Sequence, residues 1–270
     1  MLQTFSYVAP DSRKDLLAIL NKEGTRAKIL AGGTDLMVDI RGGKIAPAFV
    51  VDIKKIADLK GVSYSATEGL SIGAVTTCIE LVTDKTIVAK FPIIADAASR
   101  LGSTQLRNRA TIAGNICTAS PCADLSCAML ALGASVEIAS MTGTRIVKLA
   151  DFFTGVKTTV IKADELVTRL IVAPELVNAK FGMEKLKRIK GHDLSLASVA
   201  VVKTGTLLRV ALGSCAPTPI VLPDFPANAP LASILEVAGK TIKPIDDVRA
   251  SKEYRKMMIM TFIEQIILRL

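Results

Sequence analysis

The chain has 270 residues, of which 50% are hydrophobic, 4% are aromatic and none is tryptophan, and its formal net charge is +9. This length suits one large domain or two ordinary ones. The basic residues are spread along the chain and are not interleaved with aromatic ones, so the charge does not indicate a nucleic-acid-binding protein. No apolar stretch reaches the ~20 residues that a membrane-spanning helix needs.

Helices and strands alternate in the first two thirds of the chain. We expect a helix over Ser12–Lys22, which begins at a serine cap and stops before Gly24. Further helices are expected at Cys78–Val82, Pro92–Leu101 and Ser126–Leu132. Strands are expected at Ala27–Leu30, Ala48–Ile53, Leu70–Ala74 and Leu166–Ala173, and as a hairpin of Ser135–Ala139 with Arg145–Leu149.

The pattern changes beyond Pro174. Three successive strands, Phe181–Ile189, Ala197–Thr204 and Thr206–Leu212, precede two helices near Leu231–Ala238 and Ser251–Leu270. We therefore expect an α+β fold of two domains, residues 1–173 and 174–270, the second an antiparallel sheet with helices. The dense basic run 185–190 alternates with apolar residues and is interpreted as a half-exposed strand, with a phosphate or partner contact as the alternative.

The histidine and cysteine content excludes several chemistries. His192 is the only histidine, so a histidine-rich metal site and a catalytic triad have little support. Cys117, Cys122 and Cys127 lack the spacing of a plant-type iron–sulfur site and are interpreted as small buried thiols. An odd count of five cysteines and the absence of a secretory signal in Met1–Pro10 predict reduced thiols in the cytoplasm.

Two segments rich in small residues carry most of the functional information. The first glycine segment is Ala31–Leu36, and the second glycine segment is Thr111–Asn115. Either one alone is explained by a plain turn or a bulge. Because both place Thr, Asp or Asn beside Gly, together they predict a ligand with two phosphates, held by main-chain N–H groups from both sides.

Asp124 follows the second glycine segment and cannot contact phosphate favourably. Its carboxylate suits the hydroxyl groups of a ribose or ribityl chain. Capping of the helix expected to begin at Leu125 suits it equally well. Both roles remain open at the level of sequence.

The two glycine segments resemble the FAD loops of the flavoprotein (medium) subunit of molybdenum-containing hydroxylases, such as xanthine dehydrogenases and aerobic carbon monoxide dehydrogenases. The resemblance extends in order over nearly the whole chain. Further similar segments are Ser103–Asn108, Asp151–Gly155, Asp164–Val167, Gly213–Pro219 and Tyr254–Lys256. The fold implied is a two-part FAD-binding domain of the p-cresol methylhydroxylase or vanillyl-alcohol oxidase type, followed by a smaller α+β domain.

The resemblance also implies a set of cofactor-binding residues. Asp124 would bind on the sugar side of FAD, Leu101 would pack against the flavin and Leu166 would contact it through the backbone. Lys185 would reach the flavin region, where its positive charge would favour the reduced, anionic flavin. Backbone groups that would hold the pyrophosphate are those of Ile29, Leu30, Ala31, Gly32, Gly33, Thr34, Asp35 and Leu36, and of Thr111, Ile112, Ala113, Gly114 and Asn115.

Two positions depart from the family pattern. Ala113 replaces the first glycine of the usual Gly-Gly-Asn, and Val156 stands where many relatives have an aromatic residue. One extra methyl group is tolerated where φ is negative, so FAD binding is still expected. With few aromatic rings in the chain, the flavin would stack on aliphatic side chains or on a partner subunit.

The function implied is an FAD-carrying electron-transfer subunit with no catalytic side chain and no metal ligand of its own. Molybdenum on a large subunit would oxidise the substrate, and two iron–sulfur clusters on a small subunit would deliver electrons to FAD. From FAD they would pass to NAD or another acceptor, in a dimer of heterotrimers. The alternatives are a free-standing flavin-dependent oxidase and a non-enzymatic accessory or assembly protein.

Overall fold

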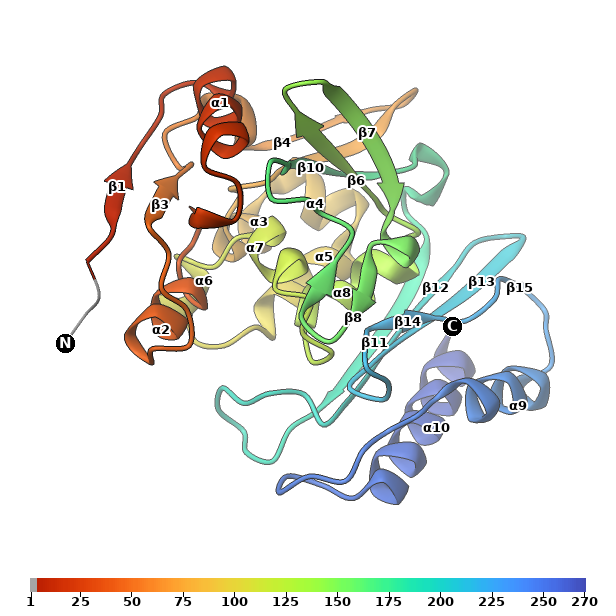
Figure 1. Ribbon diagram of the computed structural model, residues 1–270. Helices are drawn as coiled ribbons and strands as arrows, with labels where there is room; N and C mark the ends of the chain where they lie inside the picture. The colour runs from red at the N-terminus through yellow and green to blue at the C-terminus, as the bar shows by residue number, and fades with distance from the viewer. Residues whose placement is uncertain (1–3) are drawn as a thin grey trace.

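The computed structural model describes residues 4–270. The first three residues, which belong to the expected first domain and to the segment Met1–Pro10 without a secretory signal, lie outside the described residues. Three larger sheets, one two-stranded sheet and the helices packed against them form the molecule (Figure 1). Within residues 4–270, no helix is long and apolar enough to cross a bilayer.

The first sheet is parallel and carries the first glycine segment at one edge. Its strands are β1 (Ser6–Val8), β3 (Phe49–Asp52) and β2 (Ala27–Leu30), in that spatial order. Helix α1 (Arg13–Glu23) joins β1 to β2, as parallel pairing requires. The Ser12 side chain accepts a hydrogen bond from the N–H of Asp15, which confirms the predicted serine cap.

The second sheet is antiparallel, in the order β4-β5-β10-β6-β7. Its strands are β4 (Val62–Ser65), β5 (Gly69–Gly73), β10 (Leu166–Val172), β6 (Ser135–Ser140) and β7 (Gly143–Lys148). Between β5 and β6 the chain forms α3 (Cys78–Thr83), α4 (Lys85–Lys90), α5 (Pro92–Ser99), α6 (Thr104–Arg107), α7 (Ile112–Cys117) and α8 (Asp124–Ala131). Helix α2 (Leu36–Arg41) and the small hairpin of β8 (Phe153–Gly155) and β9 (Thr158–Thr159) complete this part.

The third sheet is antiparallel and is covered on both faces. Its strands are β11 (Lys180–Leu186), β12 (Ala197–Lys203), β13 (Leu207–Gly213) and β14 (Ile220–Val221), and β15 (Phe225–Pro226) also pairs with β13. Helices α9 (Leu231–Thr241) and α10 (Lys252–Arg269) lie along one face, and the first two thirds of the chain lie against the other (Figure 1). The prediction of an antiparallel sheet with helices is therefore confirmed.

Strand β12 shows why its sequence is apolar almost without interruption. Ala200 and Val202 belong to the core that includes α5 and α8, whereas Val199 and Val201 belong to the core under α9 and α10. A strand buried on both faces has no solvent-facing position. Because one core crosses residue 173, the division into domains 1–173 and 174–270 stays a prediction.

Two sequence-based expectations differ from the structure. The second glycine segment is not an open loop: Thr111 caps α7, its hydroxyl accepting from the N–H of Gly114, and Gly114 and Asn115 lie within the helix. The expected strand Phe181–Ile189 ends at Leu186, so the later residues of the basic run lie in a connection. Gly and Asn are poor helix formers, and the cap compensates for their low propensity.

Candidate functional site

One cavity of about 1070 Å³ contains residues of both glycine segments. Its wall also includes residues of 157–167, near the β8–β9 hairpin, and residues 192–194 of the β11–β12 connection. The cavity thus lies where the first sheet, the second sheet and the third sheet's connection meet. Its size is at the upper end of the range for small-molecule and cofactor sites.

The first glycine segment presents free backbone donors to this cavity. Gly33 adopts φ +79°, a conformation that favours glycine, and its carbonyl accepts from the N–H of Met37. The N–H groups of Gly32, Gly33 and Thr34 donate to no acceptor within residues 4–270. Successive unpaired amides of this kind form a concave anion site.

The two glycine segments meet at Gly32. A Cβ atom at this position would clash with the carbonyl oxygen of Arg109 and would lie 3.0 Å from Cα of Ala110. Only glycine therefore allows the first segment to reach the residues directly before the second. The predicted convergence of two segments far apart in sequence is confirmed.

In the second glycine segment the N–H groups from Ile112 to Asn115 are already in use, and that of Thr111 donates to no acceptor within residues 4–270. The N–H of Ile112 donates to Thr76 O (3.0 Å) and that of Ala113 to Ala74 O (3.3 Å). The N–H groups of Gly114 and Asn115 donate to the side chain and carbonyl of Thr111. Backbone binding of a pyrophosphate by this segment stays a prediction that these four bonds do not support. The segment offers the N–H of Thr111 and side chains instead.

Asn115 connects the second segment to α8. Its Oδ1 accepts from the N–H of Leu125 at 3.3 Å, so Asn115 satisfies an N-terminal donor of this helix and retains its amide N–H₂ as a donor. Asp124 is the first residue of α8, whose N-cap is Ala123, and it makes no capping hydrogen bond. The capping alternative for Asp124 is therefore wrong.

Asp124, which lines the cavity, instead forms a buried ion pair with Lys185 behind it. Lys185 Nζ lies 2.6 Å from Asp124 Oδ1 and donates to Arg100 O at 3.1 Å. Burial raises the pKa of Asp124, and the ammonium of Lys185 offsets part of this rise. The side chain of Lys185 is 2% exposed, so the interpretation of this residue as part of a solvated strand face is wrong.

Most of the predicted site residues line the cavity. Leu30, Ile112 and Lys185 do not: Leu30 packs beside Gly33, Ile112 is fully buried in the core, and Lys185 lies behind its partner Asp124. The predicted residues that line it are Ile29, Ala31, Gly32, Gly33, Thr34, Asp35, Leu36, Leu101, Thr111, Ala113, Gly114, Asn115, Asp124 and Leu166.

Three lysines at the cavity were not found from the sequence. Lys28, Lys157 and Lys162 line it and pair with no carboxylate within residues 4–270. Four of the five acids that line the cavity pair with a cation outside its lining, and two of these cations, Arg145 and Arg188, lower the pKa of Glu165 and Asp193. The fifth, Asp35, pairs with no cation within residues 4–270, so three unpaired lysines face one unpaired carboxylate. The lysines leave the cavity with an excess of positive charge, which suits an anionic ligand.

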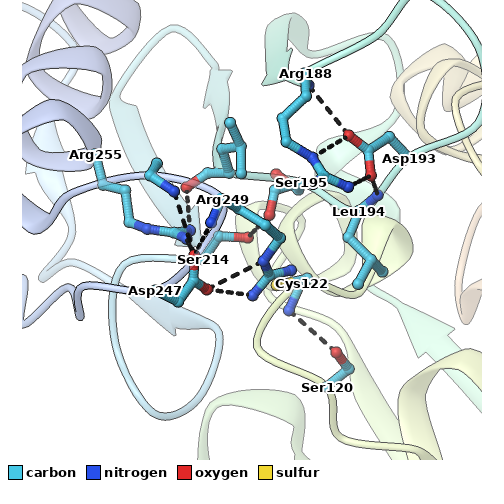
Figure 2. A network of polar contacts seen from close by, with 12 residues as sticks. Ser120, Cys122, Arg188, Asp193, Leu194, Ser195, Ser214, Asp247, Arg249 and Arg255 are labelled. Atoms are coloured by element: carbon cyan, nitrogen blue, oxygen red, sulfur yellow. Dashed lines mark hydrogen bonds and ion pairs between the residues drawn. The ribbon is translucent and has the colours of Figure 1, made fainter.

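The connection that carries His192–Leu194 is fixed from outside the cavity. Arg255 is 2% exposed and donates to Leu196 O (2.9 Å) and to Asp247 (2.7 Å), and Arg249 binds the same carboxylate (Figure 2). The N–H of Ser214 donates to Pro121 O at 2.8 Å, which ties the third sheet to the approach to α8. Arg255 thus anchors the chain two residues after the cavity-lining residues 192–194, and Arg188 binds both carboxylate oxygens of Asp193 itself.

The cysteines are all free thiols. Cys78, Cys127 and Cys215 are buried, which confirms the structural interpretation of Cys127. Cys117 and Cys122 are partly buried at the cavity, and burial raises the pKa of Cys117 to about 12. Among residues 4–270, no group of three or more His, Cys, Asp or Glu side chains could hold a metal ion.

Comparison with known proteins agrees with this geometry. Residues 3–175 match the family model described as "FAD binding domain in molybdopterin dehydrogenase". The chain is 34% identical over 239 residues to the carbon monoxide dehydrogenase medium chain of Afipia carboxidovorans, covering 88% of this chain and 80% of that protein. It is 30% identical over 281 residues to the xanthine dehydrogenase FAD-binding subunit of Escherichia coli O157:H7, covering 99% and 96%.

A solved structure shows the same fold along the whole chain. Reconstituted CO dehydrogenase from Oligotropha carboxidovorans contains a chain that matches with a TM-score of 0.93 and 30% identity, over 100% of this chain and 98% of that chain. The fold and the cavity thus define an FAD-binding subunit of an oxidoreductase. The chain belongs to the molybdenum hydroxylase family, as its medium, FAD-binding subunit.

Proposed function

We propose that this chain binds one FAD in the cavity and carries electrons within a heteromeric molybdenum hydroxylase. The observation that carries the proposal is the row of free amides at Gly32, Gly33 and Thr34, three residues that line a cavity shared with the second glycine segment. A diphosphate needs several N–H donors and positive charge, and the cavity offers both. When bound, FAD supplies the two-electron redox chemistry.

Different residues of the chain would bind different parts of the cofactor. The amides of the first glycine segment would bind the diphosphate, with the side-chain amide of Asn115 as a further donor. Asp124 would accept from hydroxyl groups on the sugar side. Leu101, at the cavity wall and 5% exposed, would pack against the flavin, and Leu166, also at the wall, would contact it through the backbone.

The partners are proposed from the relatives. Proteins named as medium chains or FAD-binding subunits imply further subunits, and we propose a large molybdenum-binding subunit and a small iron–sulfur subunit. Electrons from the small subunit would pass through FAD to NAD or another acceptor, in a dimer of heterotrimers. Five free thiols are consistent with a cytoplasmic location.

The experiment is to purify the full chain, measure its flavin content, and identify what co-purifies when it is expressed with its genomic neighbours. We expect one FAD per chain and co-purification with a molybdenum protein and an iron–sulfur protein. A chain that neither contains nor binds FAD would support an assembly protein. A flavoprotein that oxidises an organic substrate without partners would support a free-standing oxidase.

Lys185 tests whether the chain tunes the electron carrier. Lys185→Ala removes a buried positive charge beside Asp124, so we expect the reduction potential of bound FAD to fall by some tens of mV, where 30 mV is about 1.4 kcal/mol. The double variant Lys185→Ala/Asp124→Asn removes both charges and should restore part of the loss. Spectroelectrochemical titration measures both, and an unchanged potential with FAD fully bound would contradict the role of Lys185.

A further inference from the structure

A chain of polar side chains behind the first glycine segment reaches its backbone. Lys54 Nζ donates to Ala31 O at 3.2 Å and to Asp52 Oδ2 at 2.6 Å. Tyr7 Oη donates to the same Asp52 oxygen at 2.7 Å. Neither Tyr7, Asp52 nor Lys54 lines the cavity, so these three residues hold the segment from its far side.

The contact with Ala31 fixes the orientation of one peptide unit. The Ala31–Gly32 peptide is trans, so its carbonyl and the N–H of Gly32 point in opposite directions. With the carbonyl held by Lys54 on the side away from the cavity, the N–H of Gly32 is turned toward the cavity. The free donor at Gly32 is thus a consequence of the bond to Ala31.

This peptide unit needs an external anchor. It precedes two consecutive glycines, which allow many backbone conformations, and no hydrogen bond within residues 4–270 uses the N–H of Gly32. Asp52 is 7% exposed and accepts from both Lys54 and Tyr7, so it holds the ammonium in place. Since this carboxylate balances the ammonium charge, the ammonium acts chiefly by orienting the peptide.

We propose that Lys54 is a positioning residue for the cofactor diphosphate: it locks the Ala31–Gly32 peptide so that its N–H faces the bound phosphate oxygens. The inference rests on the proposed placement of FAD at the first glycine segment. It assigns a function to a residue that lies outside the cavity. Asp52 and Tyr7 support Lys54 and make no contact with the cofactor.

The test compares Lys54→Met, Lys54→Arg and Lys240→Met in the full chain after removal of flavin. Lys240 is the matched control, since its ammonium pairs with Glu236 on the surface of α9, outside the cavity. Dissociation constants for FAD, and for ADP as a competitor that has a diphosphate but no flavin, are measured by fluorescence titration. The reduction potential of the FAD-loaded variants is measured in parallel.

We expect Lys54→Met to weaken FAD and ADP by the same factor, about tenfold or more, because a charge-assisted hydrogen bond that orients a donor is lost. Lys54→Arg should stay within about threefold of the parent, since it can still donate to Ala31 O. Lys240→Met should bind as the parent does. The potential should be unchanged in all three, because the flavin ring is not the group affected.

Parent affinity in Lys54→Met would overturn the inference while leaving FAD binding intact. A parent chain that binds neither FAD nor ADP would instead reject the proposed function. If Lys54→Met does not fold, Asp52→Asn tests the same inference in the same titration. It should weaken FAD about threefold or more by releasing the ammonium, and parent affinity in that variant would equally overturn the inference.

Discussion

The two glycine segments have similar compositions and opposite hydrogen-bonding states. In the first, the N–H groups of Gly32, Gly33 and Thr34 donate to no acceptor within residues 4–270 and belong to residues that line the cavity. In the second, every N–H from Ile112 to Asn115 donates to protein. The first segment offers free backbone donors, and the second offers chiefly the polar side chains of Thr111 and Asn115. Small residues indicate where a backbone lies close to another part of the protein or to a ligand. They do not indicate whether its N–H groups are free to bind that ligand.

The largest difference between the segments should appear when one glycine in each is replaced by alanine and the losses of FAD affinity and stability are compared. In Gly32→Ala the new Cβ meets the backbone of Arg109, which cannot rotate away, so the segments must separate. We expect FAD affinity to fall at least about a hundredfold and unfolding to become easier by about 1–3 kcal/mol.

In Gly114→Ala the Cβ would lie 2.8 Å from Thr111 Oγ1, a side-chain atom, and alanine favours the helix by about 1 kcal/mol. Its stability should therefore stay within about 1 kcal/mol of the parent. Urea denaturation and FAD titration measure both variants. Equal losses in the two would show that the segments do not differ as described.

Substitutions of Asn115 distinguish a contribution to FAD binding from a contribution to stability within the second segment. Asn115→Asp keeps the oxygen that accepts from Leu125 but replaces the amide donor by a negative charge. We expect near-parent stability with FAD affinity about tenfold weaker. Asn115→Leu should in addition lose about 1 kcal/mol of stability, because the α8 donor is left unsatisfied. If Asn115→Asp binds FAD normally, this side chain does not contact the diphosphate.

The smallest effect is a pH dependence confined to the first segment. Burial tends to raise the pKa of Asp52, but hydrogen bonds from Lys54 and Tyr7 outweigh it and the pKa is lowered. A carboxylate with a lowered folded-state pKa contributes stability that is complete above pH about 4 and is lost as the pH falls through its folded value.

Acid should therefore loosen residues 31–36 before 111–117, whose cap is the uncharged Thr111. Hydrogen exchange of the two segments between pH 5 and pH 3, corrected for intrinsic rates, measures this. The matched variant Asp52→Asn should remove the difference. Simultaneous loosening of both segments in the parent would refute the assignment to Asp52.

Much of the fold and part of the site could be predicted from sequence. The serine cap at Ser12 and the short β-branched strands are local signals, and they appear at the expected places. The two glycine segments were also identified from local sequence, and the close approach of Gly32 to Arg109 and Ala110 confirms that they meet. That they share a ligand stays a prediction.

The features of the site that could not be predicted depend on contacts between residues distant in sequence. The amides of Ile112 and Ala113 are occupied by carbonyls of Thr76 and Ala74, which no local pattern around residue 111 reveals. The basic run at 185–190 alternates as an exposed strand would, yet Lys185 is buried because Asp124 compensates its charge. Lys54 follows β3 by two residues, and only the parallel pairing of β2 with β3 brings it beside Ala31.

The double burial of β12 has a consequence for how the chain unfolds. Ala200 and Val202 complete the core that supports α8, and α8 begins with the aspartate paired to Lys185 of β11. A fragment ending at residue 173 would expose that apolar surface and leave a buried carboxylate without its cation. The cofactor region and the C-terminal sheet should accordingly melt in one cooperative transition, and crystallographic or biophysical work on the flavin region requires the whole polypeptide.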